Sequence, residues 1–142
     1  MSANTSPIFI LTPNIGTTRL VAATTASDGS GTMYPLVTAG INGTRVDAVR
    51  FRNSQVALAP STAMVHRIFY SATNQSGSAT SRLVGEVATA SATRAAGTVG
   101  ATSIYTFDQP LIMPSGSGLF VCQSVYGGVA DQFDAQVFAG DY

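Results

Sequence analysis

Few residues of this chain combine the type and the spacing that catalysis requires. The most common general base is histidine, and the sequence holds one, His66, in the stretch AMVHRIF. Alternation along a strand would place His66 on the same face as the apolar Met64 and Ile68, which predicts a structural histidine. No G-x-S-x-G motif is present, and Ser115 and Ser117 belong to the turn-like stretch PSGSG. The sequence therefore predicts a protein that is not an enzyme.

Metal and phosphate chemistry are equally poorly supported. A metal site needs clustered His, Cys, Asp or Glu, and the nearest approach is Asp131 with Asp134 in ADQFD. Three positions apart on a strand, the two carboxylates would point to opposite faces. The chain has no GxxxxGK[ST] and no GxGxxG motif. Its single cysteine, Cys122, excludes an intramolecular disulfide and is predicted to be buried. No metal and no cofactor are expected.

The basic residues are more distinctive. All seven are arginine, they balance seven acidic residues, and three of them, Arg45, Arg50 and Arg52, lie in GINGTRVDAVRFRNS, residues 40–54. A net charge of zero argues against a nucleic-acid partner, because such proteins normally carry a basic excess that neutralises phosphates. Arginine suits protein contacts, since its planar guanidinium is weakly hydrated and bonds carboxylates in pairs. The arginines are therefore expected in protein contacts or in internal ion pairs.

Strand alternation divides these arginines into two groups. On an uninterrupted strand, Arg45 and Asp47 share the core-directed face with Val49, close enough to pair with each other. Arg50 and Arg52 then stand side by side on the outer face, about 7 Å apart, where like charges repel mildly unless acids lie opposite. The acids that could serve are Glu86, Asp108, Asp134 or those of a partner protein.

The elements that would position these residues are short strands. Residues that favour strands fall in short runs separated by Gly, Pro, Asn and Ser clusters, which is typical of all-β proteins. The expected strands are 7–12, 18–25, 32–39, 45–52, 63–72, 81–90, 102–113, 118–126 and 132–140. Only 90–98 could hold a helical turn. This pattern predicts one all-β domain over residues 8–142, an antiparallel β-sandwich of jelly-roll type, preceded by a short flexible N-terminal arm over residues 1–7.

Several of these strands are apolar on both faces, namely PIFILT, MVHRIFY and GLFVCQSVY. Only one face of each sheet in a two-layer sandwich meets the core. The second face therefore needs a cover, which could be a loop of the chain, an arm or another subunit. Only 10% of the residues are charged, against about 25% in typical globular domains. Such a surface gives little repulsion between molecules and favours self-association.

Neither a membrane nor a secretory route is expected. No stretch approaches the ~18 apolar residues of a transmembrane helix. The first residues, MSANTSPIFIL, have no basic segment and no long apolar run, so they do not resemble a signal peptide.

Five stretches carry a resemblance that covers most of the chain: SPIFILTPNIGTTRLVAATTASDGSGT, LVTAGINGTRVDAVRFR, RIFY, LIMPSGSGLFVCQS and VFAGDY. They resemble small structural proteins encoded in the head-gene regions of tailed bacteriophages. The resemblance implies a capsid decoration (cement, or auxiliary capsid) protein. Such a protein is a β-rich homotrimer, made in the cytoplasm of the bacterial host, that sits on the capsid surface and binds between subunits of the major capsid protein.

The resemblance also suggests which residues make contacts. The basic residues usual around the middle strands are here Arg50, Arg52 and Arg67, and Tyr142 completes the acid–aromatic C-terminus. The apolar root of the arm is a candidate docking segment that could add a strand to a partner, and it consists of Ile8, Phe9, Ile10 and Leu11.

Phage tail, fibre or baseplate β-modules share much of this composition, and they bind a host glycan or another tail protein. Exposed aromatic residues gathered in one groove would favour that alternative, for example Tyr34, Tyr105 and Tyr126.

Overall fold

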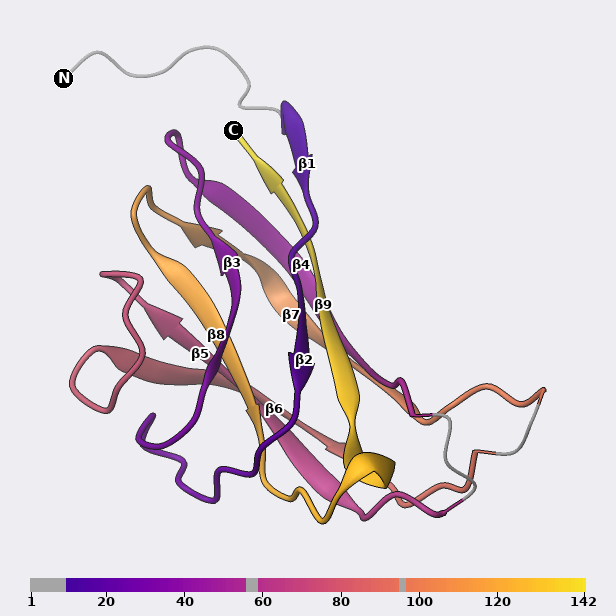
Figure 1. The fold of residues 1–142 in the computed structure, drawn as a ribbon. Coiled ribbons are helices and arrows are strands. Elements are labelled where there is room, and N and C mark those ends of the chain that lie inside the picture. The colour runs from indigo at the N-terminus through magenta and orange to yellow at the C-terminus, as the bar shows by residue number, and fades with distance from the viewer. Residues whose placement is uncertain (1–9, 56–58, 95–96) are drawn as a thin grey trace, which may run out of the picture.

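The computed structural model describes residues 10–55, 59–94 and 97–142, which form two antiparallel β-sheets packed face to face (Figure 1). Sheet A has the strand order β1-β9-β4-β7, and β2 pairs with β9 further along the edge that β1 also uses. The strands of sheet A are β1 (Thr12–Asn14), β2 (Thr17–Leu20), β4 (Thr44–Asn53), β7 (Thr102–Met113) and β9 (Phe133–Asp141).

Sheet B has the strand order β3-β8-β5-β6. Its strands are β3 (Tyr34–Thr38), β5 (Met64–Ser71), β6 (Ser81–Thr89) and β8 (Gly118–Gln123). A short 3-10 helix, η1 (Val129–Asp131), precedes β9. The prediction of an all-β antiparallel sandwich is therefore confirmed.

The observed strands follow the predicted ones closely from residue 32 onward, and the predicted range 102–113 coincides with β7. The predicted strand 18–25 is too long, because β2 ends at Leu20. The predicted arm, residues 1–7, and most of the predicted strand 7–12 lie outside the described residues.

The helical turn considered for residues 90–98 is not found in the described part of that stretch. Thr93 instead forms an isolated antiparallel bridge with Pro60. The turn that does form is η1, within the Gly-rich stretch before β9.

Apolar side chains from both sheets fill the space between them. In β9, Phe133, Ala135 and Val137 are each 0% exposed, as the alternation in QFDAQVF predicts. Full burial of a side chain such as Phe or Val contributes about 1.5–3 kcal/mol relative to leaving it exposed. Other residues at 0% exposure in this core are Leu20, Val46, Val49, Phe51, Ile68, Met113, Leu119 and Val121.

A loop of the chain covers part of the outer face of sheet B. Phe69 on β5 and the neighbouring Phe120 and Cys122 on β8 form a second buried cluster, with Met33 packed against it. Met33 belongs to the loop of residues 21–33 between β2 and β3. The sequence predicted that the second apolar face of such strands is covered by a loop of the chain, an arm or another subunit. For this cluster the cover is a loop of the chain.

Arg67 fastens this loop to sheet B. Its Nη1 donates hydrogen bonds to the carbonyl oxygens of Thr24 and Thr25, at 3.2 and 3.4 Å, and its Nε lies 2.8 Å from Oε1 of Glu86. The amide of Thr24 also donates to the carbonyl of Gln123, at 2.8 Å, where β8 ends. The loop therefore covers the β5–β8 part of the outer face of sheet B, whereas Leu83 on the neighbouring edge strand β6 is 38% exposed.

Candidate interaction surface

A β-bulge in β4 decides which of its side chains face outward. The pairing with β9 advances from Val46 to Ala48 in β4 for one residue in β9, so Asp47 is an extra residue. The bulge reverses the alternation beyond it, and Val46 and Val49, three positions apart, are both 0% exposed. Arg45 consequently lies on the outer face. Its predicted place on the core-directed face is wrong, because that prediction assumed an uninterrupted strand.

The predicted pairing of Arg45 with Asp47 is confirmed. The Nη2 atom of Arg45 lies 2.9 Å from Oδ1 of Asp47, and both side chains are more than 40% exposed. An ion pair this open to water contributes about 0–1 kcal/mol. Its main effect is therefore to neutralise one of the three arginines on β4.

Arg50 stands on the outer face of sheet A and is held there by neutral groups. Its Nη2 donates a hydrogen bond to Oε1 of Gln136 on β9. Its guanidinium carbon lies 5.4 Å from the ring centroid of Phe138, in cation–π contact. These contacts orient the guanidinium and leave its charge without a carboxylate.

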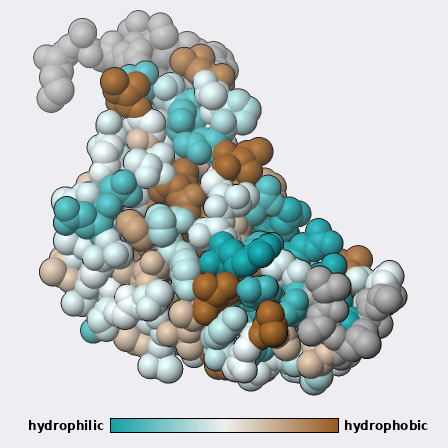
Figure 2. Space-filling model, in the orientation of Figure 1, coloured by the Kyte–Doolittle hydropathy of each residue, from teal (hydrophilic) through white to brown (hydrophobic). Residues whose placement is uncertain are grey.

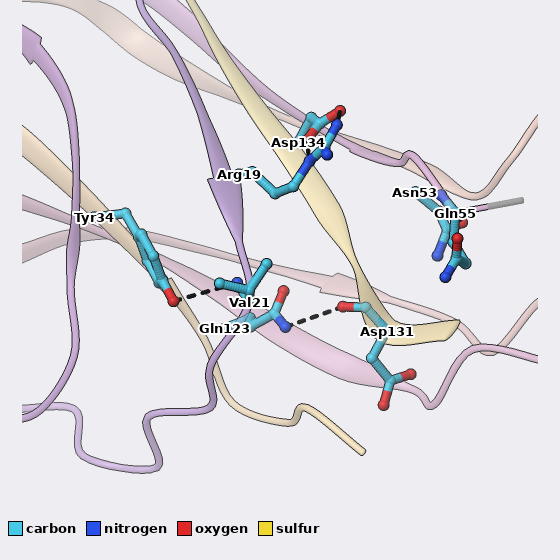
Figure 3. Close-up of polar contacts among 8 residues, drawn as sticks. All are labelled: Arg19, Val21, Tyr34, Asn53, Gln55, Gln123, Asp131 and Asp134. Atoms are coloured by element: carbon cyan, nitrogen blue, oxygen red, sulfur yellow. Dashed lines mark hydrogen bonds and ion pairs between the residues drawn. The ribbon is translucent and has the colours of Figure 1, made fainter. Parts of the chain in front are cut away.

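Arg52 is the exposed neighbour of Arg50 and makes no hydrogen bond or ion pair with any other described residue. Its partner across the β4–β9 register is Asp134. That carboxylate is already engaged by Arg19 of β2, whose Nε lies 2.8 Å from Oδ1 and whose Nη2 lies 3.3 Å from Oδ2 (Figure 3). The hydrogen bond and charge of Asp134 also raise the pKa of Arg19. Arg52 therefore keeps an uncompensated positive charge.

These residues line an open hollow of about 560 Å³ on sheet A. Three arginines and one aspartate face it, so its net charge is positive in a chain whose total charge is zero. The space-filling view shows strongly hydrophilic residues (teal) clustered on the surface, with individual hydrophobic residues (brown) beside them (Figure 2). The lining residues are Thr17, Thr18, Arg19, Arg50, Arg52, Asp134, Ala135 and Gln136.

Apolar side chains lie on the same outer face. Phe138 is 38% exposed, and Ile104 and Ile112 of β7 are 54% and 56% exposed. Ile104 pairs with Arg50 across the β4–β7 register, and Ile112 pairs with Arg45. These three residues are not among the contact residues that the sequence predicts. The available signal was that Phe138 directly follows the core-facing Val137, so the two cannot share a face.

The candidate docking residues at the N-terminal end are only partly described. Ile8 and Phe9 lie outside the described residues. Ile10 is 40% exposed and sits over Gly140 on the outer face of sheet A, where an added Cβ would come within 2.2 Å of its Cγ2. Leu11 is 76% exposed, and its amide donates to the carbonyl of Asp141 at 2.9 Å.

Tyr142 and Arg67, the remaining candidate contact residues, lie apart from the hollow. The amide of Tyr142 donates to the carbonyl of Gly43 at 3.1 Å, and its side chain is partly exposed beside that turn. Arg67 is 14% exposed and engaged by Glu86 and the loop of residues 21–33. The structure therefore brings Arg50 and Arg52 together and leaves Arg67 on the other sheet.

His66 lies in the interior of the sandwich. Its ring stacks on Phe51, with centroids 4.4 Å apart, and lies 4.7 Å from the ring of Phe133. Burial lowers its pKa to about 3, so it is neutral at ordinary pH. Neither ring nitrogen has a hydrogen-bond partner among the described residues. The neighbouring Gln123 donates to the carbonyl of Asp131 at 3.0 Å (Figure 3).

Two of the three tyrosines that would indicate a glycan-binding groove, Tyr34 and Tyr105, lie on opposite sides of the sandwich. Tyr34 lies on β3, an edge of sheet B beside β2, and its hydroxyl accepts a hydrogen bond from the amide of Val21. Tyr105 lies on β7 at the opposite side of the sandwich, where its hydroxyl donates to the carbonyl of Val84. Each hydroxyl is engaged within the chain.

No family model, curated protein or solved structure matches this chain. Within the described residues, no group of three or more His, Cys, Asp or Glu side chains could hold a metal ion. The same part of the chain contains no helix of the length and hydropathy needed to span a bilayer.

Proposed function

We propose that this chain is a structural protein of a tailed phage virion that decorates and stabilises the capsid. In this role it is a homotrimer on the capsid surface, made in the host cytoplasm, that binds between subunits of the major capsid protein. It has no enzymatic activity and needs no cofactor, nucleic acid or membrane. The sequence resemblance to head-region phage proteins is the starting point of this proposal.

The strand order supports a jelly-roll fold as part of the proposal. If β1 and β2 count as one strand position, the two sheets are β2-β9-β4-β7 and β3-β8-β5-β6. Apart from β5 to β6, each connection from β2 onward passes from one sheet to the other. Eight strand positions in two sheets with such crossings fit a double Greek key, an architecture common in viral capsid proteins.

The observation that carries the proposal is the contrast between the two outer faces. The chain's own loop covers the β5–β8 part of sheet B and leaves Leu83 as its exposed large apolar residue, whereas sheet A presents aromatic, aliphatic and arginine side chains together to solvent. Aromatic residues and arginine are enriched at protein interfaces, and charged residues other than arginine are depleted there. A virion protein would use this face for contacts with other subunits.

The interior gives no support to an enzymatic role. The single histidine is 0% exposed and packs against aromatic rings, so no substrate reaches it. A tail or fibre module that binds another protein would use the same outer face. The position of the protein on the particle, on the capsid or on the tail, distinguishes a decoration protein from a tail or fibre module.

An image reconstruction of the intact phage particle tests the proposal. The expected result is density of this fold at the joints between capsomers, and shells that lose the protein should disassemble at lower temperature, because binding stabilises the assembled state. Adding the purified chain back should restore that temperature. Density on the tail instead, or shells whose stability does not depend on the chain, would refute a capsid role.

A further inference from the structure

We infer that the outer face of sheet A is the contact between copies of this chain, and that Asp108 of one copy pairs with Arg52 of the next. The inference rests on the self-association in the proposed function and names the surface that performs it. It follows from the distribution of charge, the exposed apolar side chains and the shape of β7.

The pairing of charges within the chain leaves few groups for contacts with other molecules. Three arginines form ion pairs with carboxylates of the chain, in the pairs Arg19–Asp134, Arg45–Asp47 and Arg67–Glu86. Arg82 and Arg94 instead donate to backbone carbonyls. Arg50 donates to Gln136, and Arg52 has no partner in the part of the chain that the structure describes. The uncompensated basic groups on sheet A are thus Arg50 and Arg52.

Among the acidic residues, one also lacks a partner among the described residues. Asp131 is 2% exposed, and its carboxylate accepts hydrogen bonds from the amides of Thr62 and Gly127. Asp141 binds Asn14 and Thr44, and Asp28 binds Ser30. Asp108 is exposed and has no hydrogen bond or ion pair with any described residue. It is the acid of this chain best placed to meet an unpaired arginine.

The strand geometry keeps Asp108 away from Arg52 of its own chain. Arg52 pairs with Thr102 on β7, whereas Asp108 lies beyond Thr106, which pairs with Ala48. Four strand positions separate these two levels, which is about 13 Å. Between Thr106 and Leu111, four residues of β7 stand opposite the single bulge residue of β4. Asp108 is one of them, exposed at the edge of sheet A.

The apolar neighbours make this face suitable for a second copy. Phe138, Ile104 and Ile112 are between 38% and 56% exposed; Phe138 and Ile104 lie beside Arg50, and Ile112 lies further along the same face beside Arg45. Burying them would supply the favourable free energy of association. The charge pair would fix the register of the contact more than its affinity. In a ring, each copy gives Arg52 to one neighbour and Asp108 to the other.

Charge reversal with rescue tests the pairing. The full chain is compared with Arg52→Glu, with Asp108→Arg and with the double variant, and the association constant is measured by sedimentation equilibrium. Each single variant should weaken association at least tenfold, because like charges meet at the contact, and the double variant should restore it. Matched controls are Arg82→Glu and Asp28→Arg, whose positions lie on β6 and in the loop over sheet B and should leave association unchanged.

Three outcomes would overturn the inference: a wild-type chain that stays monomeric, single variants that associate normally, or single variants that the double variant does not rescue. Circular dichroism confirms that each variant folds. If one does not, Arg52→Gln and Asp108→Asn replace the reversals, and each should weaken association and flatten its dependence on salt. A monomeric chain that still binds phage shells refutes this inference alone. A rescued oligomer that is absent from the particle refutes the proposed function alone.

Discussion

The imidazole of His66 lies parallel to the ring of Phe51, with the ring centroids 4.4 Å apart and the planes 6° from parallel. The two residues come from opposite sheets, β5 and β4, so this stack spans the interior of the sandwich. His66 is 0% exposed, and protonation would place a charge among aromatic rings, where no described carboxylate acts on it.

The first prediction concerns stability against pH. Burial lowers the pKa of His66 to about 3, whereas an unfolded chain binds the proton near its ordinary value of 6.5. Above pH 6.5 the histidine is neutral in both states and has no effect. Below it, the free energy of unfolding should fall by about 1.4 kcal/mol per pH unit, until the folded histidine itself protonates near 3.

Urea unfolding at pH 7, 6 and 5 measures this slope in a range where carboxylates titrate little. His66→Leu should flatten the slope. Equal slopes for the wild type and the variant would show that His66 does not control acid stability.

The second prediction concerns the loop over sheet B. Cys122 lies beneath it and is the only cysteine, so a thiol reagent reports on this site alone. Burial raises the pKa of Cys122 to about 11, which further slows its reaction. Arg67→Ala removes the bonds to the loop and should speed labelling of Cys122 by about tenfold or more, as local opening becomes easier. Arg82→Ala is the control, and an unchanged rate in the Arg67 variant would contradict the fastening role.

The third prediction concerns the seam between β6 and β7. A Cβ added to Gly85 would lie 2.6 Å from Cζ of Tyr105. Gly85→Ala should therefore destabilise the fold by about 1–3 kcal/mol, as overpacking does in other cores. Adding Tyr105→Leu should recover part of this loss, so the two changes should not be additive in urea unfolding. Additive effects would mean that the ring moves aside without cost.

The fourth prediction concerns the carboxylate that joins the end of β9 to β1 and β4. Burial raises the pKa of Asp141, but hydrogen bonds from Asn14, Thr44 and Gly40 outweigh it and lower the pKa overall. The ionised form thus stabilises the fold above the ordinary pKa, and this contribution is lost as the pH falls through the lowered value. At pH 7, Asp141→Ala should cost about 1–3 kcal/mol in thermal or urea unfolding. Asp28→Ala is the control: Asp28 accepts hydrogen bonds from Ser30, two residues away in an exposed loop, so its loss should cost much less than the loss of Asp141.

Local patterns predicted the strands but not how they meet. Beta-branched and aromatic runs located every strand after residue 32, and alternation in QFDAQVF correctly placed Phe133 in the core. No Gly or Pro within β4 indicates the bulge at Asp47 in the sequence. An uninterrupted strand therefore places Arg45 on the wrong face. Pro110 was an available signal for the irregular part of β7, since proline inside a strand favours edges and bulges.

The candidate surface was predicted only in part. Arg50 and Arg52 emerged from composition and alternation, because arginine without lysine is visible in the sequence. The partners of the other charges depend on contacts between distant strands, such as Arg19 with Asp134, which are 115 residues apart. Residue spacing in the sequence does not predict contacts between distant strands. It therefore could not predict which arginine lacks an acidic partner.

The position of β9 has a consequence for synthesis. This strand lies in the middle of sheet A, between β4 on one side and β1 and β2 on the other, yet it comes last in sequence among the described strands of the sandwich. Until Phe133–Asp141 has left the ribosome, the early strands of sheet A have nothing to join them, and β4 presents an open edge. The sandwich must therefore close after translation of its final strand, and a chain halted before that point would expose a template for pairing with other nascent chains.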